Sequence, residues 1–291
     1  MRVACIGEAM IELSMTEPPR VGVAGDTLNT AIYLKRAAPG LHVDYITRLG
    51  KDPFSSQIRD FIASHDIGTD RIETSASRIP GLYAITTDDG ERSFTYWRGQ
   101  SAARDMFQTD DEPNFASLRG YDVVYLSAIT LAILPAWMRS TLLDHIKGGP
   151  MLAFDSNYRP NLWASPAEAR DCISKWWAAA QIALPSIDDE MALMNEPADA
   201  VEARFIAMGT EGALKRGANG PLSLGPAQVP EQAYPSARSV VDTTAAGDSF
   251  NGAYLGALLT GKTQAEALSA GHACAAHVVG HPGAIVPPPG T

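Results

Sequence analysis

The sequence between residues 241 and 252 reads Val241-Asp242-Thr243-Thr244-Ala245-Ala246-Gly247-Asp248-Ser249-Phe250-Asn251-Gly252. Its small residues run directly into a long helical pattern over Gly247–Thr260, and a second helical stretch, Thr263–Val279, follows. The first backbone N–H groups of a helix have no intrahelical partner, and together with the helix dipole they bind anions such as phosphate. The segment therefore predicts a phosphate-binding turn at the start of a long helix.

Asp248 supplies a carboxylate in the first turn of this predicted helix. A carboxylate beside a bound phosphate can accept a proton from an attacking hydroxyl, which phosphoryl transfer requires. Ala245, Ala246 and Gly247 are small enough for a ligand to approach the backbone closely. The alternative is that Asp248 only caps the helix, because Asp favours such positions.

Upstream of this segment, short apolar runs alternate with helical patterns. The runs predicted as buried strands are Val3–Gly7, Val43–Leu49, Val123–Ser127, Leu152–Asp155, Ile182–Leu184 and Phe205–Met208. The helices predicted between them are Leu28–Arg36, Ser55–Ser64, Ala136–Ile146, Pro166–Ala180 and Asp188–Asn195. This alternation implies right-handed crossovers and a central, mostly parallel sheet flanked by helices on both faces. We therefore expect a three-layer α/β fold, with residues 1–291 forming a single domain.

One segment interrupts the alternation. Two strand-like runs, Leu82–Thr87 and Arg92–Arg98, are joined by Asp88-Asp89-Gly90, which is a strong hairpin signal. With Ile11–Met15 and Arg20–Val23 they predict a small antiparallel β sheet at one edge, built from about residues 11–23 and 78–98. This sheet is either a peripheral hairpin or a lid over a site.

The composition is that of an ordinary globular enzyme. The chain has 291 residues, 45% hydrophobic and 19% charged, and its net charge of −10 argues against a general nucleic-acid or membrane-surface binder. No targeting segment is apparent, and the Ala-rich stretch 265–280 carries Glu266 and two histidines and is too short to span a bilayer. The three cysteines, Cys5, Cys172 and Cys274, stand far apart, so we expect a reducing, cytoplasmic setting.

Two common nucleotide-binding motifs are missing from the sequence. It contains no G-x-x-x-x-G-K-[ST], and no predicted strand opens into G-x-G-x-x-G. A P-loop enzyme and a nicotinamide-dependent dehydrogenase therefore have little support, and the phosphate-binding role falls on the helix that begins near Gly247.

Residues 242–253, DTTAAGDSFNGA, closely resemble the signature of the ribokinase-like (PfkB-type) carbohydrate kinases. In that family a D-T-x-G/A-A-G-D run forms an anion hole and supplies the catalytic base. The resemblance covers nearly the whole chain. Three further matches follow the family's order: Gly25–Ala31 resembles the sugar-binding G-x-x-x-N, Thr47–Asp52 the strand and turn that follow, and Gly209–Gly212 the G-x-x-G turn beside the nucleotide phosphates. Together the four matches favour a catalytic Asp248 over a simple cap.

The resemblance implies an ATP-dependent kinase that uses Mg²⁺. Asp248 would be the general base, and the backbone of Ala245, Ala246 and Gly247 would form the anion hole. The residues expected at the nucleotide are Gly209, Gly212, Thr243, Ala245 and Gly247.

Three stretches narrow the expected substrate to a sugar acid. Phe154–Trp163 is similar to the D-x-N-x-R-x-x-L-W run of 2-keto-3-deoxygluconate kinases and some fructokinases, and Gly7–Leu13 is similar to the N-terminus of the former group. Tyr96-Trp97-Arg98 matches a Y-x-R with which such kinases bind the sugar acid. A planar guanidinium can hold a carboxylate through two hydrogen bonds, which suits an arginine to this substrate.

The implied contacts with the sugar can be divided by its two ends. Gly25 and Asn29 would hold its hydroxyls, whereas Tyr96 and Arg98 would hold the acid end, with Tyr83 on the facing strand. Arg159 would lie nearer the transferred phosphoryl group. The alternatives are that the arginines are solvated surface charges and that the tyrosines pack within the hairpin.

The sequence departs from the family pattern at three places. The family's N-x-x-E, linked to magnesium through water, is here Ser186-Ile187-Asp188-Asp189, so that only Asp189 keeps a carboxylate for an indirect metal contact. A lysine often found two residues before the G-x-x-G turn is replaced by Ala207. Only Glu196–Ala203 precedes the predicted strand at Phe205, which suggests a trimmed crossover helix.

The expected reaction is transfer of phosphate from MgATP to the C6 hydroxyl of 2-keto-3-deoxygluconate. A fructokinase or another sugar kinase of the family is the nearest alternative. A non-catalytic carbohydrate-binding relative is less favoured, because the base and the anion-hole residues are both present. Lids of this kind mediate dimerisation in relatives, so the resemblance also implies a homodimer or a higher homo-oligomer.

Overall fold

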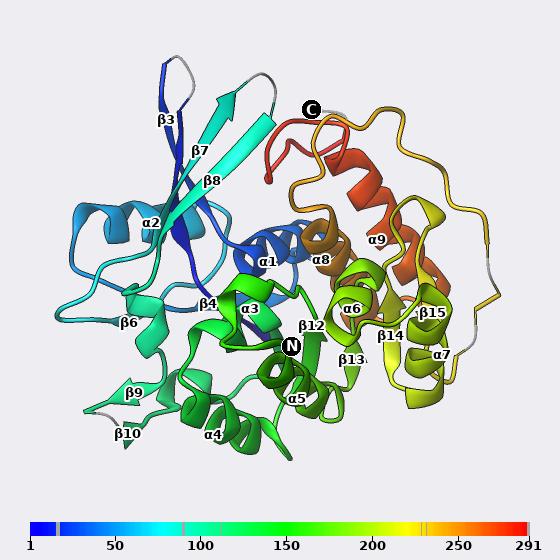
Figure 1. Ribbon diagram of the computed structural model, residues 1–291, viewed down its shortest axis with the longest axis horizontal. Helices are drawn as coiled ribbons and strands as arrows, with labels where there is room; N and C mark the ends of the chain where they lie inside the picture. Colours follow the sequence, from blue (N-terminus) through cyan, green and yellow to red (C-terminus); the bar gives the residue numbers. More distant parts are fainter. Residues whose placement is uncertain (16–17, 89–90, 111, 228, 231, 290–291) are drawn as a thin grey trace.

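The computed structural model describes residues 1–291 except 16–17, 89–90, 111, 228, 231 and 290–291. A seven-stranded sheet forms its centre (Figure 1). Its strand order is β15 (Leu222–Leu224), β14 (Glu211–Leu214), β13 (Ile182–Ala183), β12 (Met151–Asp155), β11 (Val123–Ser127), β1 (Arg2–Ile6) and β4 (His42–Ile46). Neighbouring strands are parallel except for β15, which is antiparallel to β14.

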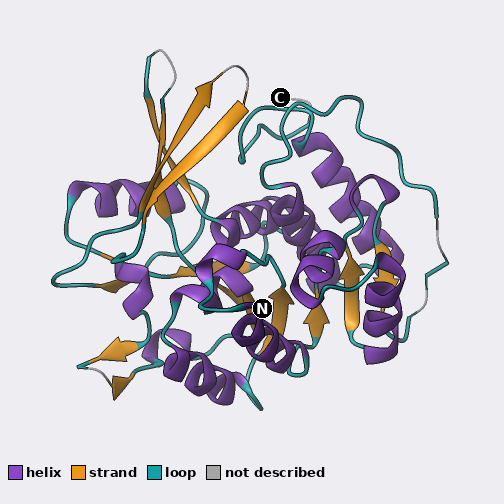
Figure 2. Ribbon diagram, viewed as in Figure 1, coloured by secondary structure: helices purple, strands orange, loops and turns teal. Residues whose placement is uncertain are grey.

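Helices cover both faces of this sheet (Figure 2). One face packs against α1 (Asp26–Ala37), α2 (Pro53–Ala63), α8 (Ala246–Leu259) and α9 (Gln264–Val278). The other packs against α3 (Ala128–Ile133), α4 (Ala136–Ile146), α5 (Pro166–Trp177), α6 (Ile187–Met194) and α7 (Ala198–Met208). Side chains alternate along a strand, so Val3 and Cys5 of β1 enter the first core and Ala4 and Ile6 the second. The predicted three-layer α/β fold is confirmed.

The structure corrects three of the predicted elements. Phe205–Met208 is not a strand: it ends helix α7, and the strand begins after it as β14. Helix α7 fills the crossover, so the expected trimmed connection is wrong. The run 43–49 is divided, because β4 ends at Ile46 and Arg48–Leu49 (β5) pairs instead with Glu73–Thr74 (β6).

The predicted small sheet, which is the candidate lid, is present as two antiparallel strand pairs. Strand β2 (Met10–Ser14) pairs with β3 (Arg20–Ala24), and β7 (Leu82–Asp88) pairs with β8 (Glu91–Trp97). A parallel pairing of β2 with β7 joins them into one sheet of order β3-β2-β7-β8, which projects beyond the central layers in Figure 1. The predicted turn Asp88-Asp89-Gly90 includes residues 89–90, which lie outside the described residues.

Helices α1 and α8 lie unusually close together. A Cβ atom at Gly252 of α8 would come within 2.6 Å of the Thr30 carbonyl oxygen and of the Tyr33 Cβ on α1. One turn later, a Cβ at Gly256 would lie 2.7 Å from the Ala37 Cβ. Glycine at both positions therefore permits an approach that any larger residue would prevent, and it brings the first turn of α8 against α1.

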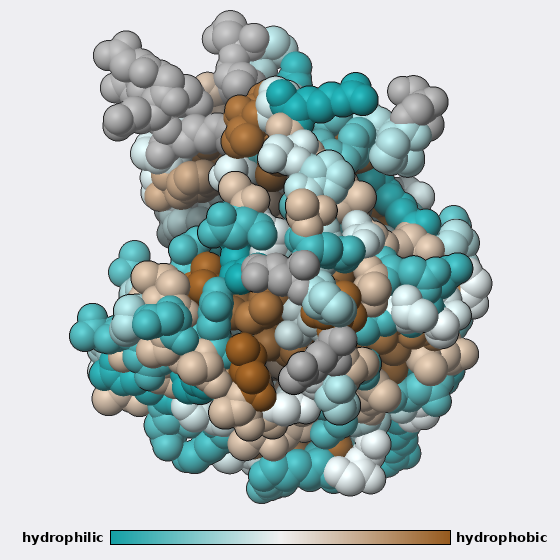
Figure 3. All heavy atoms as spheres, turned by 90° about the vertical axis from the view of Figure 1, so that its right-hand side faces the viewer, coloured by the Kyte–Doolittle hydropathy of each residue, from teal (hydrophilic) through white to brown (hydrophobic). Residues whose placement is uncertain are grey.

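The face that carries α7, α9 and the long segment before α8 mixes hydrophilic and hydrophobic side chains (Figure 3). Val240 and Val241 are exposed in the segment that leads into Asp242, at 69% and 59%. Within the described part of the chain, no helix has the length and apolar character needed to cross a membrane.

Candidate active site

The site forms where α8 begins, at the carboxyl ends of the parallel strands. Ala245 precedes the helix in a left-handed conformation, with φ 60° and ψ 17°. The first intrahelical bond runs from the Ser249 N–H to the Ala245 carbonyl at 2.9 Å, so the N–H groups of Gly247 and Asp248 precede it. The Ala246 N–H donates to the Thr243 carbonyl at 3.2 Å. Thr243 thus shapes the turn, and the two N–H groups after Ala246 are the ones oriented for an anion.

Asp248 is held by α1. The Asn29 Nδ2 group donates to Asp248 Oδ2 at 2.8 Å, and the Thr30 hydroxyl donates to the Asp248 carbonyl oxygen at 3.2 Å. Asn29 is in turn fixed by the backbone, because its N–H donates to the Gly25 carbonyl at 2.8 Å. Two segments separated by more than two hundred residues therefore meet at this carboxylate.

The surroundings of Asp248 raise its pKa to about 8. Burial is the largest cause, and the nearby carboxylates of Asp26 and Asp155 add to it. The hydrogen bond from Asn29 and the charge of Lys215 act in the opposite direction. A carboxyl group with a pKa in this range can take up and release a proton near neutral pH, as a general base must.

Lys215 is the cation of the site, and the sequence analysis missed it. It follows β14, and its Nζ lies 3.0 Å from Asp155 Oδ1 and 3.0 Å from Asn251 Oδ1. A Cβ at Gly247 would lie 3.9 Å from Lys215 Nζ, so the ammonium stands beside the anion-binding turn. Asn251 donates to Asp155 Oδ2 at 2.6 Å and thereby ties α8 to the end of β12.

The structure does not bring Gly209 and Gly212 to this site. Gly209 ends α7 with φ 69°, before β14 begins, and Gly212 lies inside β14 against the Ala183 carbonyl. Both therefore lie toward the amino end of β14, whereas Asp248 lies at the carboxyl ends of the strands, and the structure does not bring them together with it. Gly217-Ala218-Asn219-Gly220 repeats the G-x-x-G spacing at the other end of β14, and Lys215 stands two residues before it. The lysine taken to be replaced by Ala207 is thus present as Lys215.

Asp26 is a second carboxylate at the start of α1. Its Oδ2 accepts hydrogen bonds from the Ser127 hydroxyl and from Asn157 Nδ2, the latter at 2.8 Å. These partners stand at or just beyond the ends of β11 and β12, so Asp26 joins both strands to the helix that holds Asn29. Gly25, just before it, packs so closely that a Cβ there would lie 2.5 Å from the Glu8 carbonyl oxygen.

Arg159 and Asp189 lie together beside Lys215 and Asp155. Arg159 Nη1 is 3.3 Å from Asp189 Oδ1, and 53% of the arginine side chain remains exposed. The pKa of Asp189 is raised to about 6, chiefly by burial, against the lowering effect of Arg159. The neighbouring charge of Asp155 raises this pKa, and that of Lys215 lowers it.

Magnesium fits this donor set only as an ion that arrives with nucleotide. Among the described residues, no group of three or more His, Cys, Asp or Glu side chains could hold a metal. Mg²⁺ commonly keeps several waters and binds through one or two carboxylates together with phosphate oxygens. Asp189, whose carboxylate lies beside Lys215 and Asp155, is the residue that would receive such a water.

The three lid residues expected at the sugar share one face of the lid. Tyr83 and Tyr96 are register partners with ring centroids 5.4 Å apart, and Arg98 follows Tyr96 by two residues. Tyr83 is buried and donates to Glu12, whereas Tyr96 is 52% exposed. Arg98 forms an ion pair with Glu8, so it is not a free surface charge. Glu8 and Glu12 were not singled out in the sequence.

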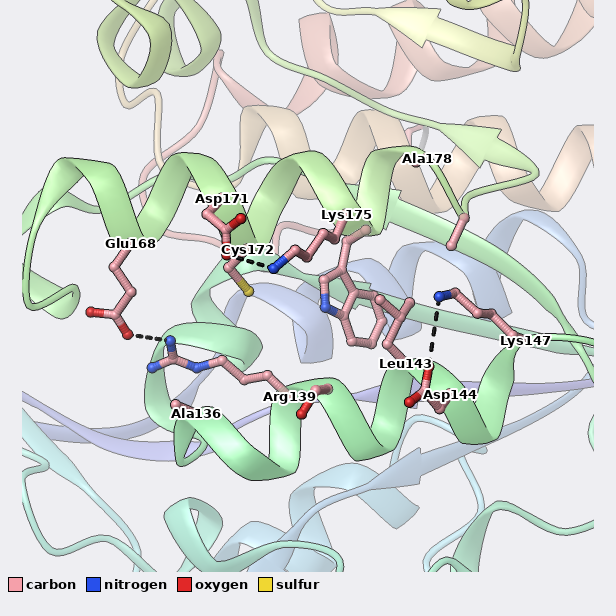
Figure 4. Close-up of a pocket in the computed structure, with 13 residues that line it drawn as sticks. Ala136, Arg139, Leu143, Asp144, Lys147, Glu168, Asp171, Cys172, Lys175 and Ala178 are labelled. Atoms are coloured by element: carbon pink, nitrogen blue, oxygen red, sulfur yellow. Dashed lines mark hydrogen bonds and ion pairs between the residues drawn. The ribbon is translucent and has the colours of Figure 1, made fainter.

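A pocket outside this site lies between α4 and α5 (Figure 4). Its three cations each pair with a carboxylate that also lines it: Arg139 with Glu168, Lys147 with Asp144, and Lys175 with Asp171. Asp248, the turn before α8 and Lys215 are not among its lining residues. This pocket therefore takes no part in the arrangement around Asp248.

Comparison with known proteins places this geometry in context. A 2-dehydro-3-deoxygluconokinase of Dickeya dadantii (strain 3937) is 41% identical, with 98% of this chain and 96% of the relative covered. A fructokinase of Solanum tuberosum is 29% identical, covering 87% of this chain and 79% of its own length.

Among solved structures, the aminoimidazole riboside kinase of Salmonella enterica, complexed with aminoimidazole riboside and an ATP analogue, superposes with a TM-score of 0.80. It is 25% identical and covers 98% of this chain and 95% of that one. The profile of the family described as pfkB family carbohydrate kinase matches residues 1–290. The family profile and the relative both match over nearly the whole length, and the chain belongs to the pfkB family of carbohydrate kinases.

Proposed function

We propose that this chain is a 2-dehydro-3-deoxygluconokinase, which phosphorylates the C6 hydroxyl of 2-keto-3-deoxygluconate with MgATP. The observation that carries the proposal is Asp248, a carboxylate of raised pKa placed beside an anion-binding helix start and fixed by Asn29. The relative at 41% identity supports this substrate over fructose, because the fructokinase is only 29% identical. We treat residues 1–291 as one kinase domain that acts in the cytoplasm.

In the proposed step, Asp248 accepts the proton of the C6 hydroxyl while that oxygen attacks the γ-phosphorus of ATP. The bond between the γ-phosphorus and the bridging oxygen breaks, and its electron pair leaves with ADP. The N–H groups of Gly247 and Asp248 would stabilise the phosphoryl oxygens, and Lys215 would offset their negative charge. Magnesium bound to the phosphates would supply further positive charge, with Asp189 holding one of its waters.

At the sugar, we assign the hydroxyls to Asn29 and Gly25 and the acid end to Tyr83, Tyr96 and Arg98. Support comes from their placement, because the lid residues share one face and Gly25 packs against the peptide that carries Glu8. Arg159 is assigned to the transferred phosphoryl group. Its ion-pair partner, Asp189, lies near Asp155 and Lys215, because the charges of both residues shift the pKa of Asp189.

The substrate is tested by ADP release with MgATP and a panel of 2-keto-3-deoxygluconate, its galacto epimer, fructose, ribose and gluconate. We expect strong turnover only with the keto-deoxy acids. Turnover of fructose or ribose in preference to the acids would retain Asp248 as base and overturn the proposed substrate.

Replacing the base should separate chemistry from binding. Asp248→Asn keeps the shape of the side chain but cannot accept the proton, so we expect kcat to fall by about 100- to 10,000-fold. Calorimetry should show ATP affinity within a few-fold of wild type. Asp171→Asn, at an exposed carboxylate on α5, is the matched control. A near wild-type kcat for Asp248→Asn would refute the assignment.

The pH profile should report the raised pKa of Asp248. Because the base acts deprotonated, kcat/KM should rise with pH through the pKa of about 8 and level off only above it. Asp26→Asn removes a charge that raises this pKa and should move the rise to lower pH, whereas Lys215→Met removes a charge that lowers it and should move the rise to higher pH. Shifts of both variants in the same direction would contradict this electrostatic account.

We also propose that the lid mediates a homodimer. Val21 and Trp97 lie on the same face of this sheet and are 50% and 59% exposed, so they form an apolar surface that a second copy can cover. Light scattering should give twice the chain mass of 31.0 kDa, and Trp97→Glu should give the monomer. Trp137→Glu, at a tryptophan 42% exposed on α4, should remain dimeric. A monomeric wild type would overturn the proposed dimer.

A further inference from the structure

Glu8 and Arg98 meet at the point where the lid joins the core. Glu8 lies between β1 and the first lid strand, β2, and Arg98 directly follows the last lid strand, β8. Their side chains form an ion pair in which the carboxylate is 1% and the guanidinium 12% exposed. The pair therefore connects the first and last segments of the lid, in a setting almost closed to water.

The Glu8–Arg98 ion pair is buried, but not all of its polar atoms form hydrogen bonds. Among the described residues, Glu8 Oε1 and Arg98 Nε have no hydrogen-bond partner, although both atoms are buried. Gly81 makes room for the carboxylate, because a Cβ there would lie 2.8 Å from Glu8 Oε1. A buried ion pair offsets the cost of desolvation only when further hydrogen bonds satisfy it. Stability alone is therefore a weak reason for a glutamate at this position.

Most of the N–H donors of Arg98 have no partner among the described residues. A guanidinium has five N–H donors in a planar fork, and Glu8 is bonded through Nη2. Within the described residues no other partner of Arg98 is found. An arginine that is fixed by one hydrogen bond and keeps unpaired donors can bind a carboxylate with little loss of side-chain freedom.

Glu8 is also joined to the sugar-hydroxyl side of the site. Its carbonyl oxygen lies so close to Gly25 that a Cβ there would come within 2.5 Å. Gly25 in turn accepts the Asn29 N–H, and Asn29 donates to Asp248. One short chain of contacts thus runs from Arg98 through residue 8 to the catalytic base.

We infer that Glu8 is a positioning residue, which holds Arg98 in the orientation that receives the carboxylate of the sugar acid. This inference rests on the proposed function, because it assumes a substrate with an acid group. It adds a residue to recognition that makes no contact with the substrate itself. Glu8 sets the distance between the acid-binding arginine and the base that acts at the other end of the sugar.

The test compares Glu8→Ala, Glu8→Gln and Arg98→Ala with wild type. Binding of 2-keto-3-deoxygluconate is measured by calorimetry without ATP, and KM for the acid and for MgATP is measured by ADP release. Arg98→Ala should weaken acid binding about 10- to 100-fold. Glu8→Ala should weaken it about 5- to 20-fold, because the long arginine side chain loses its restraint. Glu8→Gln keeps an acceptor for Arg98 and should stay within a few-fold of wild type. In all three, KM for MgATP should stay within a few-fold of wild type.

Asp105→Ala is the matched control, since it breaks the Arg78–Asp105 ion pair, 2.7 Å long, near the same junction and leaves Arg98 intact. Its acid binding should match wild type. Unchanged or tighter acid binding by Glu8→Ala would overturn the inference, as would an equal rise in both KM values.

The failure of the inference can be distinguished from that of the proposed function. If the wild-type protein binds the acid but does not phosphorylate it, only the proposed function is overturned. The Kd values of the variants for the acid would then still test the role of Glu8. A wild type that does not bind the acid would overturn both. If Glu8→Ala does not fold, Glu8→Gln provides the test. The inference is contradicted if Glu8→Gln weakens acid binding as much as Arg98→Ala does, because glutamine keeps an acceptor for the Arg98 hydrogen bond.

Discussion

The close approach of α1 and α8 is the constraint on which the site depends. Gly252 and Gly256 allow it, since a Cβ at either position would come within 2.7 Å of α1. The approach places Asn29 within hydrogen-bond distance of Asp248 and lets the Thr30 hydroxyl reach the carbonyl of the same residue. A wider spacing of the two helices would break the hydrogen bond between Asn29 and Asp248, even if the central sheet were unchanged.

The site around Asp248 contains more carboxylates than nearby lysine ammonium groups, an imbalance that a bound cation would reduce. Asp26, Asp155 and Asp248 stand near one ammonium group, Lys215, and burial and mutual repulsion raise the pKa of Asp248. Positive charge that accompanies a nucleotide would relieve this imbalance, so we expect cation and phosphate to bind here together. The same reasoning applies to Asp189, whose pKa is raised although Arg159 lies beside it. Functional sites often concentrate perturbed carboxylates in this way.

Much of the fold could be predicted from the sequence, because buried strands and amphipathic helices have different periods. The elements that failed were short. Phe205–Met208 is as apolar as a buried strand, yet it completes one turn of α7. That error displaced the assignment of the G-x-x-G turn by eight residues and hid Lys215. Site residues close to Asp248 in the sequence could be predicted. The parts played by Glu8, Asp26 and Asp155 could not, because they depend on which strand ends lie next to one another in the fold. Pairing between distant segments is set by packing, which no local pattern contains.

The parallel pairing of β2 with β7 has a consequence for how the molecule assembles. It joins Ile11 to Leu82, and the contact of α1 with α8 joins segments still farther apart. Contacts between residues distant in sequence form slowly, because a long loop must close before they stabilise anything. During synthesis the N-terminal strands and α1 emerge first, but Asn29 has no carboxylate to donate to until Asp248, in the last fifth of the chain, has been made. The arrangement around Asp248 can therefore form only after nearly the whole chain has been made, and a chain truncated before α8 would contain every strand of the central sheet but not Asp248.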